Sequence, residues 1–448
     1  MTQKHSNPMK VAIASFIGTT VEYYDFFIYG TAAALVFPTL FFPSSDPLMG
    51  ALLSFATFGV GFFARPVGGI VFGHFGDRIG RKTMLIISLV GMGLATCLMG
   101  LLPGYATAGI WAPVLLTMLR LAQGFCVGGE WGGATLMAVE HAPRGKRGFY
   151  GAFPQMGAPA GVAIATLAFL LVSQLPDQAF FAWGWRLPFL LSAVLVMVGL
   201  VIRLTIAESP EFERVRKLET RVRMPIVTAF KWHWREIFIV AGIYLSQGVF
   251  AYISMSYLVS YATKIVGIDR TMALLGVFVA GVVAVVLYAL FGALSDRIGR
   301  KTIYLLGATA MGVVVGPALW LINTGNAWLF MAALVLVFGI AMAPAGGVTG
   351  PLFSFAFKPE VRYTGASIGY TISQILGSAF APMIATALYT ATGSTIGLFV
   401  YLTVVSIISI VSVLLLPGPL GRTEAAMQDR EFSAEDNGAA QPSVRAVA

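Results

Sequence analysis

Twelve long apolar runs constrain this chain more than any other feature of its sequence. A helix needs about 20 apolar residues to cross the hydrocarbon core of a bilayer. The runs lie at residues 11–37, 49–75, 83–103, 111–138, 148–174, 187–206, 236–263, 271–294, 302–323, 327–355, 364–391 and 395–416. Only 11% of the 448 residues are charged, against about 25% in soluble domains. We therefore predict an all-α membrane protein with twelve transmembrane helices, and a soluble enzyme is excluded.

The positions of the basic residues predict how these helices are oriented. With the N-terminus placed in the cytoplasm, 23 of the 29 Lys and Arg residues fall in cytoplasmic segments, three in the opposite loops and three inside the runs. Basic residues collect in cytoplasmic loops of membrane proteins. Both termini are therefore predicted to be cytoplasmic, and the net charge of +9 needs no nucleic-acid partner.

An internal repeat divides the chain into two halves. Residues 77–83 and 296–302 carry the same seven residues, Asp-Arg-Ile-Gly-Arg-Lys-Thr, and each copy follows the second apolar run of its half. We predict a cytoplasmic N-terminus (1–10), two pseudo-symmetric six-helix halves (11–206 and 236–416), a cytoplasmic central loop (207–235) and a disordered cytoplasmic tail (417–448). Transporters built from such repeats bind their substrate between the halves, near the middle of the membrane.

The repeated loop resembles the signature loop of the major facilitator superfamily. Gly-x-x-x-Asp-Arg-x-Gly-Arg-Lys begins at Gly73 and again at Gly292. The stretch Glu22-Tyr-Tyr-Asp-Phe-Phe-Ile-Tyr-Gly30 is similar to the first helix of the metabolite:proton symporters within that superfamily. Residues 30–81 are most similar to the shikimate transporters. The resemblance covers residues 10–416 and implies the major facilitator fold, transport by alternating access, and no enzymatic activity.

The resemblance also implies that the repeated loops hold the two halves together in one conformational state. Physically, an Asp in such a loop can cap a neighbouring helix or pair with an Arg. The candidate gating residues are Gly73, Asp77, Arg78, Gly80 and Arg81 in the first loop, Asp296, Arg297, Gly299 and Arg300 in the second, and Arg65 in helix 2. For Arg65, a gate and a bond between helices both remain open.

Two carboxylates in the first helix are candidates for proton coupling. Glu22, Asp25 and Tyr29 are spaced i, i+3 and i+7, so they share one helical face. Removal from water favours the neutral form of a carboxylate and a nearby Arg favours its charged form, so such a group can exchange a proton. A fixed ion pair with Arg65 or Arg120 is the alternative. Glu130 in helix 4 is a further candidate, with a gate as its alternative.

The candidate substrate site combines charged groups of the first half with polar groups of the second. An Arg binds a carboxylate through two parallel hydrogen bonds, and the resemblance also ties an Arg followed by Gln-Gly in helix 4 to proton transfer. A structural ion pair is the alternative for Arg120. The substrate-binding candidates are Arg120, Gln123, Tyr29 and Trp131 in the first half, and Gln247, Tyr370 and Gln374 in the second.

These features predict a secondary active transporter in the cell membrane that imports a small organic acid, shikimate-like or another carboxylate, by proton symport. We expect no cofactor besides the proton gradient and no metal, because Cys97 and Cys126 lack any ligand spacing. A monomer in the lipid bilayer is expected. The alternatives are a proton symporter of zwitterions such as betaine or proline, and an exporter of metabolites or drugs. In the antiporter branch of the superfamily, helix 5 carries a Gly-Pro pair. In this chain the corresponding sequence is Gly157-Ala-Pro159, so an Ala separates the two residues, which favours symport.

Overall fold

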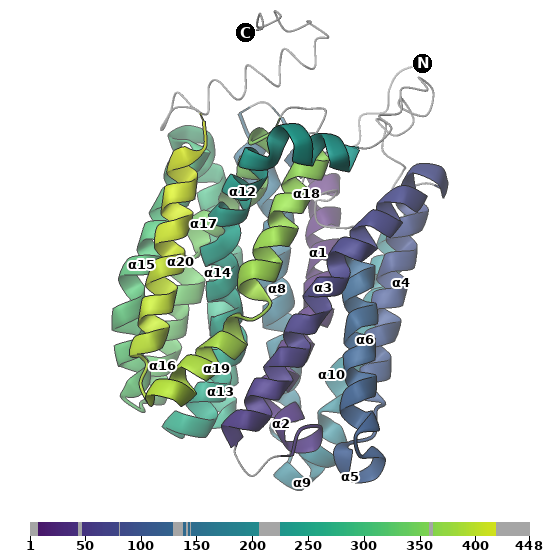
Figure 1. Cartoon of the computed structure of the whole chain (residues 1–448), viewed down its shortest axis with the longest axis vertical. Coiled ribbons are helices and arrows are strands. Elements are labelled where there is room, and N and C mark those ends of the chain that lie inside the picture. Colours follow the sequence, from purple (N-terminus) through teal and green to yellow (C-terminus); the bar gives the residue numbers. More distant parts are fainter. Residues whose placement is uncertain are drawn as a thin grey trace, which may run out of the picture.

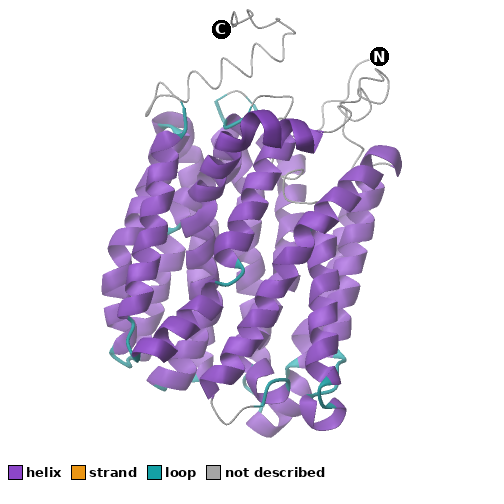
Figure 2. Cartoon of the chain, viewed as in Figure 1, coloured by secondary structure: helices purple, strands orange, loops and turns teal. Residues whose placement is uncertain are grey.

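A computed structural model gives the architecture of the chain. It describes residues 8–43, 47–79, 81–128, 138–139, 142–143, 145–205, 225–357 and 362–417. These residues form helices and connecting loops, and none of the described residues forms a strand (Figure 2). Long apolar sequences form helices in a bilayer because every backbone polar group must then be satisfied within its own segment.

Six spans make up the first half of the chain. The spans are α1 (Pro8–Leu35), α3 (Pro47–Ile79), α4 (Arg81–Gly100), α6 (Trp111–Val127), α8 (Arg147–Val172) and α10 (Arg186–Thr205), and short turns α2 (Phe37–Leu40), α5 (Tyr105–Ala108) and α9 (Asp177–Ala179) connect them. A π-helical turn, Phe180–Gly184, precedes α10.

The second half also has six spans, and three of them contain π-helical segments. Its helices are α12 (Pro225–Tyr252), α13 (Leu258–Tyr261), α14 (Arg270–Ile298), α15 (Arg300–Asn323), α16 (Ala327–Leu334), α17 (Ala343–Phe355), α18 (Arg362–Ser373), α19 (Ala381–Thr392) and α20 (Ile396–Leu415). The π-helical segments are Ile253–Tyr257 and Ala262–Val266 around α13, Val335–Ala341 between α16 and α17, and Gln374–Ser378 between α18 and α19.

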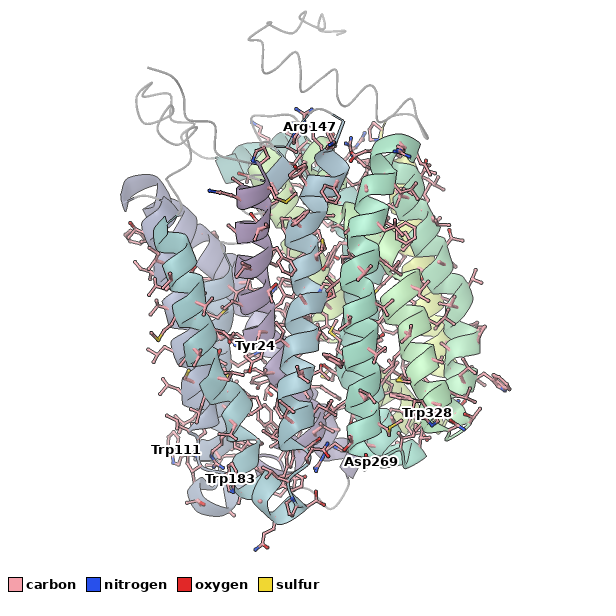
Figure 3. The ribbon with its side chains drawn as sticks, turned by 180° about the vertical axis from the view of Figure 1, so that it is seen from behind. Tyr24, Trp111, Arg147, Trp183, Asp269 and Trp328 are labelled. Carbon is pink, nitrogen blue, oxygen red and sulfur yellow. The ribbon has the colours of Figure 1, made fainter. Side chains whose placement is uncertain are left out.

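The described helices account for the twelve predicted spans. Nine are long and apolar enough to cross a membrane, one further span is a bent pair, and two shorter apolar helices, Ile86–Gly100 and Trp111–Val127, supply the rest. The start of α1 and the end of α20 lie at the same end of the molecule (Figure 1). Trp111, Trp183 and Trp328 lie near the opposite end, away from Arg147 (Figure 3).

The boundary between the halves differs in detail from the sequence prediction. Helix α12 begins at Pro225, inside the predicted connection 207–235. His233 has non-helical angles (φ −128°, ψ 23°), so a short first segment is bent away from the span that follows. The remainder of that connection and the predicted tail from residue 418 lie outside the described residues.

The halves meet along α8 and α14, which pack side by side (Figure 3). Small residues allow this close approach. A Cβ at Gly292 of α14 would lie 2.6 Å from the Cβ of Ala152 in α8.

Candidate functional site

Arg120 lies at the centre of a cluster of aromatic rings. It is completely buried in α6, and its guanidinium carbon lies 4.1 Å from the ring centre of Phe26, 4.3 Å from that of Tyr29 and 4.8 Å from that of Phe58. Contacts between a cation and an aromatic face are worth about 2 kcal/mol when both groups are removed from water. These rings, from α1 and α3, therefore hold the charge of Arg120 inside the bundle.

The guanidinium of Arg120 is only partly satisfied by hydrogen bonds. Nη1 donates to Oε1 of Gln123, and Nε donates to the carbonyl oxygen of Phe58 at 3.5 Å. Nη2 has no hydrogen-bond partner among the described residues, and no described carboxylate forms an ion pair with this arginine. Gly61 leaves space for the group, since a Cβ there would lie 2.8 Å from Nε. One buried donor of Arg120 thus lacks a partner among the described residues.

Arg65 approaches the same phenylalanine as Arg120. Its guanidinium carbon lies 4.5 Å from the ring centre of Phe26 and 4.5 Å from that of Phe62. The residue is buried, and its Nε has no hydrogen-bond partner in the described part of the chain. The structure therefore brings Arg65, a gating candidate, next to the substrate-binding candidate Arg120.

Tyr252 of the second half inserts into this aromatic cluster. Its ring centre lies 5.4–5.8 Å from those of Phe26, Phe27, Phe58 and Phe62. Tyr252 is the last residue of α12, directly before the π-helical turn Ile253–Tyr257. The cluster around the two arginines therefore lies where the two halves of the chain meet.

The polar candidates of the second half form hydrogen-bonded groups close to this junction. Tyr370 and Tyr23 of α1 place their hydroxyl oxygens 2.8 Å apart, and Gln374 Nε2 donates to the Tyr370 hydroxyl at 2.9 Å. Gln374 Oε1 has no partner among the described residues. Gln247 Oε1 accepts a hydrogen bond from Thr349 at 2.6 Å. Tyr370 thus links the halves directly, while Gln247 is bound within its own half.

Asp25 lies inside the first half and not between the halves. Its side chain is completely buried, and Oδ1 accepts a hydrogen bond from the Ser192 hydroxyl of α10. Oδ2 has no partner among the described residues. Neither Arg65 nor Arg120 forms an ion pair with it, so the fixed ion pair considered from the sequence is absent for Asp25 in the described residues.

Gln123 connects the environments of Arg120 and Asp25. Its Oε1 accepts from Arg120, and its Nε2 donates to the Asp25 carbonyl oxygen at 3.0 Å and to Thr96 Oγ1 at 2.8 Å. Both ends of the amide are occupied. Gln123 therefore positions Arg120, and its contacts leave no free group for a substrate in this arrangement.

Glu22 and Tyr29 occupy different surroundings although they share a helical face with Asp25. Glu22 is 6% exposed and lies close enough to Tyr23 and Tyr370 to interact with them electrostatically. Tyr29 donates to Thr57 Oγ1 at 2.8 Å and places its ring on Arg120. The three candidates of α1 thus have different neighbours. Glu22 faces the second half, Asp25 faces the interior of the first half, and Tyr29 faces Arg120.

The second repeated loop joins the halves at the end that carries Arg147. Asp296 accepts hydrogen bonds from the backbone nitrogens of Gly148, at 2.7 Å, and Phe149, at 3.0 Å, in the first turn of α8. It also pairs with Arg300 at 3.2 Å. A carboxylate is stabilised by the positive end of a helix dipole. Asp296 thus makes both interactions expected of it, capping and pairing.

The other gating candidates of this loop are Gly299, Arg300 and Arg297. Gly299 has φ +102° and forms the turn between α14 and α15, a conformation that favours glycine. Arg300 is 1% exposed and stacks on Phe355, with 4.7 Å between its guanidinium carbon and the ring centre. Arg297 is exposed.

A second set of contacts joins the halves at the opposite end of the same helix pair. Arg270, at the start of α14, donates to Asp177 Oδ1 at 3.1 Å and to the carbonyl oxygen of Ser173 at 3.3 Å, just after α8. Its guanidinium carbon lies 4.0 Å from the Phe180 ring centre. Helix α8 therefore has a carboxylate at its N-terminus and a guanidinium at its C-terminus, both supplied by α14.

Several predicted site residues, or their side chains, lie outside the part of the chain that the structure describes. Glu130, Trp131 and Gly80 lie outside the described residues, and Gly73, Asp77, Arg78 and Arg81 lie in helical segments whose side chains are not described.

Sequence reasoning missed several residues of the site, among them Ser192, Thr96, Phe26 and Tyr23. Ser192 and Thr96 are hydroxyl residues in largely apolar helices, which is a weak signal because such residues commonly bond their own backbone. Phe26 and Tyr23 belong to the aromatic stretch of helix 1. There the sequence does not distinguish a ring that contacts an arginine from a ring that packs in the core.

Comparisons with known proteins agree with this fold. The family described as "Sugar (and other) transporter" matches residues 10–224, and the family described as "Major Facilitator Superfamily" matches residues 240–439. The crystal structure of a D-xylose-proton symporter superposes with a TM-score of 0.70 at 18% identity, covering 94% of this chain and 99% of that one. At this identity the likeness supports the fold alone.

Curated relatives are much more similar in sequence. An inner membrane metabolite transport protein of Escherichia coli (strain K12) is 44% identical over 403 residues, which is 87% of this chain and 90% of the relative. The shikimate transporter of the same organism is 38% identical, covering 92% and 95%, and its proline/betaine transporter is 33% identical, covering 90% and 82%. The chain therefore belongs to the major facilitator superfamily and is a multi-pass membrane transport protein, not an enzyme.

Proposed function

We propose that this transporter imports a small organic acid together with a proton, without a cofactor, by alternating exposure of a site between its halves. One observation carries this proposal. Arg120 is a completely buried cation with an unpartnered Nη2 and no ion pair within the described residues. Burying an unpaired charge is costly, and a substrate carboxylate supplies the missing negative charge.

In this proposal the proton binds a different residue from the substrate, namely Asp25. Asp25 is buried among helices of the first half, with one carboxylate oxygen on Ser192 and the other unpartnered among the described residues. No described cation pairs with it, so a bound proton would remove the cost of burying its negative charge. Substrate on Arg120 and a proton on Asp25 together neutralise both buried charges, and the loaded carrier can then change conformation. Glu22 and Glu130 remain the alternative proton carriers.

Gln123 couples the two events in this mechanism. It bonds the Arg120 guanidinium at one end and the Asp25 backbone at the other. Movement of Arg120 toward a bound carboxylate therefore strains or breaks a bond that also holds the first helix near Asp25. The amide acts as a positioning group, and it transfers no proton itself.

Uptake of zwitterions is the second candidate, because a proline/betaine transporter is 33% identical to this chain. Quaternary ammonium groups are commonly bound by aromatic rings. Here the guanidinium groups of Arg65 and Arg120 already occupy faces of Phe26, Phe62, Tyr29 and Phe58. A substrate cation would meet two positive charges, so the arrangement favours an anion. The separated Gly-Pro pair of helix 5, which lies in α8, argues against an exporter.

The proposed orientation follows from the basic residues. The end with Arg147 also carries Arg297 and Arg300, so we place it, both termini and the central loop in the cytoplasm. Trp111, Trp183 and Trp328 at the other end are 49–65% exposed, as expected for residues at a membrane–water interface. We propose that the protein acts as a monomer in the cell membrane.

Uptake into proteoliposomes tests this function. The purified chain is reconstituted, and accumulation of labelled shikimate, succinate and glycine betaine is measured with and without an imposed proton gradient, inside alkaline. We expect accumulation of an acid above its external concentration only with the gradient, and none with a protonophore. Gradient-driven uptake of betaine but of neither acid would favour the zwitterion alternative.

A further inference from the structure

Two buried arginines share one aromatic ring, and neither has a negative partner among the described residues. Arg65 and Arg120 come from different helices, α3 and α6, yet both guanidinium carbons lie within 4.5 Å of the centre of the Phe26 ring. Their exposed fractions are 8% and 0%. Like charges repel strongly when water is excluded between them, and contact with an aromatic ring offsets only part of that cost.

Each of the two arginines has one buried donor that no described residue binds. Arg65 Nε and Arg120 Nη2 are buried and have no hydrogen-bond partner in the described part of the chain. Buried guanidinium donors without partners are rare in folded proteins. Two such donors on neighbouring cations therefore indicate a ligand that carries more than one acceptor group.

The second half of the chain closes over the same place. Tyr252 packs against Phe26 and Phe62, the two rings that contact Arg65. Arg65 is also close enough to Tyr370 of α18 to act on it electrostatically. The arginine pair therefore faces the junction of the halves, where a transported molecule must pass, and not the lipid.

We propose that Arg65 is a second anion-binding residue and that the substrate carries two carboxylates, one bound by Arg65 and the other by Arg120. The inference rests on the proposed uptake of organic acids and narrows its substrate class. A small dicarboxylate neutralises both buried cations, whereas a monocarboxylate leaves one of them unpaired. Selectivity for two acidic groups follows from this difference, since removing one partner of a buried charge pair is heavily penalised.

Succinate and butyrate form a matched pair of probes because they have the same number of carbons and differ in the second carboxylate. Their affinities for the purified full-length chain are measured by isothermal titration calorimetry at a pH where both are ionised. We expect the wild-type protein to bind succinate at least about tenfold more tightly than butyrate. Arg65→Gln should remove most of that preference by weakening succinate about tenfold, with butyrate changed less than about threefold.

Arg120→Gln is the matched variant, and it should weaken both acids because it removes the primary site. Thermal denaturation without ligand shows whether each variant is folded, and the wild-type preference tests the proposal even if Arg65→Gln does not fold. Equal binding of both acids to the wild-type protein, or equal weakening of both by Arg65→Gln, overturns the role of Arg65. Absence of binding by any carboxylate, including shikimate, instead overturns the proposed function.

Discussion

Arg120 and Asp25 are joined through the side chain of Gln123 and not by an ion pair. Gln123 accepts a hydrogen bond from Arg120 Nη1 and donates one to the Asp25 carbonyl oxygen at 3.0 Å. The Asp25 carboxylate itself turns toward Ser192 of α10. The candidate substrate-binding group, Arg120, and the candidate proton carrier, the Asp25 carboxylate, therefore have different neighbours. One neutral amide links the two residues.

The contact between Arg120 and Gln123 predicts the effect of introducing a negative charge at position 123. Gln123→Glu puts a carboxylate against the Arg120 guanidinium, where it competes with the substrate for the same positive charge. We expect the affinity for a carboxylate substrate to fall about tenfold or more, measured by titration calorimetry. Gln123→Leu is the control, since it removes the amide without adding a charge, and it should weaken binding less. Unchanged affinity in Gln123→Glu would mean that Arg120 does not bind the substrate.

Replacing Arg120 by Lys tests whether the geometry of the guanidinium matters beyond its charge. An ammonium group forms no bidentate pair with a carboxylate and is more strongly hydrated. It also stacks less well on Phe26 and Tyr29, which now contact a planar group. We expect Arg120→Lys to reduce uptake at low substrate concentration by about tenfold or more. Wild-type KM and maximal rate in this variant would remove Arg120 from the binding site.

The fold was largely predictable from the sequence because each span satisfies its own backbone. The repeated segment at Asp77 and Asp296 indicated two related halves, and the family comparison confirms the major facilitator fold. The bends were less predictable. Tyr252 and Gln374 lie directly at π-helical turns, where one extra residue per turn changes the direction of every following side chain. No periodicity in an apolar run marks such a turn.

The candidate site was predictable in its residue types but not in its pairings. Helical spacing places Glu22, Asp25 and Tyr29 on one face, yet a central helix has neighbours on all sides, so the three contact different parts of the bundle. Asp25 accepts a hydrogen bond from Ser192, which lies 167 residues further along the chain. The spacing of residues within one helix does not predict a partner on a distant helix. Phe26 is a further case, because an aromatic residue in a membrane helix has the same sequence signature whether it contacts lipid or an arginine.

Asp296 is predicted to stabilise the state in which α8 and α14 are in contact. Asp296→Asn removes the charge and one of the two acceptors that bind Gly148 and Phe149, at a cost of about 1 kcal/mol. That cost should shift the equilibrium between states about fivefold. It should be detected as faster alkylation of a cysteine placed at Ala152, which is buried against Gly292, and as a lower maximal rate of transport.

Arg297→Gln is the matched control for this loop, because Arg297 is exposed and carries a charge in the same turn. It should leave both alkylation and transport near wild-type values. If Asp296→Asn behaves like this control, the contact with α8 contributes nothing to the transport cycle, and the loop serves only to orient the helices in the membrane.

The orientation is tested by labelling single cysteines. With Cys97 and Cys126 replaced by Ala, a cysteine at Asp177, which is exposed, should react with a membrane-impermeant maleimide added to intact cells. A cysteine at residue 220, in the central loop, should react only after the membrane is permeabilised. The physical reason is the excess of basic residues on the side of the central loop. Labelling at residue 220 in intact cells would reverse the proposed topology.

The coupling role of Asp25 predicts a separation between two transport activities. Asparagine resembles a permanently protonated aspartate in shape and charge, and it can still accept the hydrogen bond from Ser192. The loaded carrier of Asp25→Asn should therefore reorient and exchange labelled for unlabelled substrate across the membrane. It cannot release a proton, so accumulation driven by a proton gradient should be lost, which uptake into proteoliposomes measures directly.

Glu22→Gln is the matched control for Asp25→Asn, because both substitutions neutralise a buried carboxylate of α1 while keeping its size. The two residues face different surroundings: Asp25 contacts Ser192 inside the first half, and Glu22 lies close to Tyr370 of the second. Accumulation that survives in Asp25→Asn and fails in Glu22→Gln would assign the proton to Glu22 and place coupling at the junction of the halves. Normal accumulation in both variants would exclude helix α1 as the coupling site and leave Glu130 as the next carboxylate to substitute.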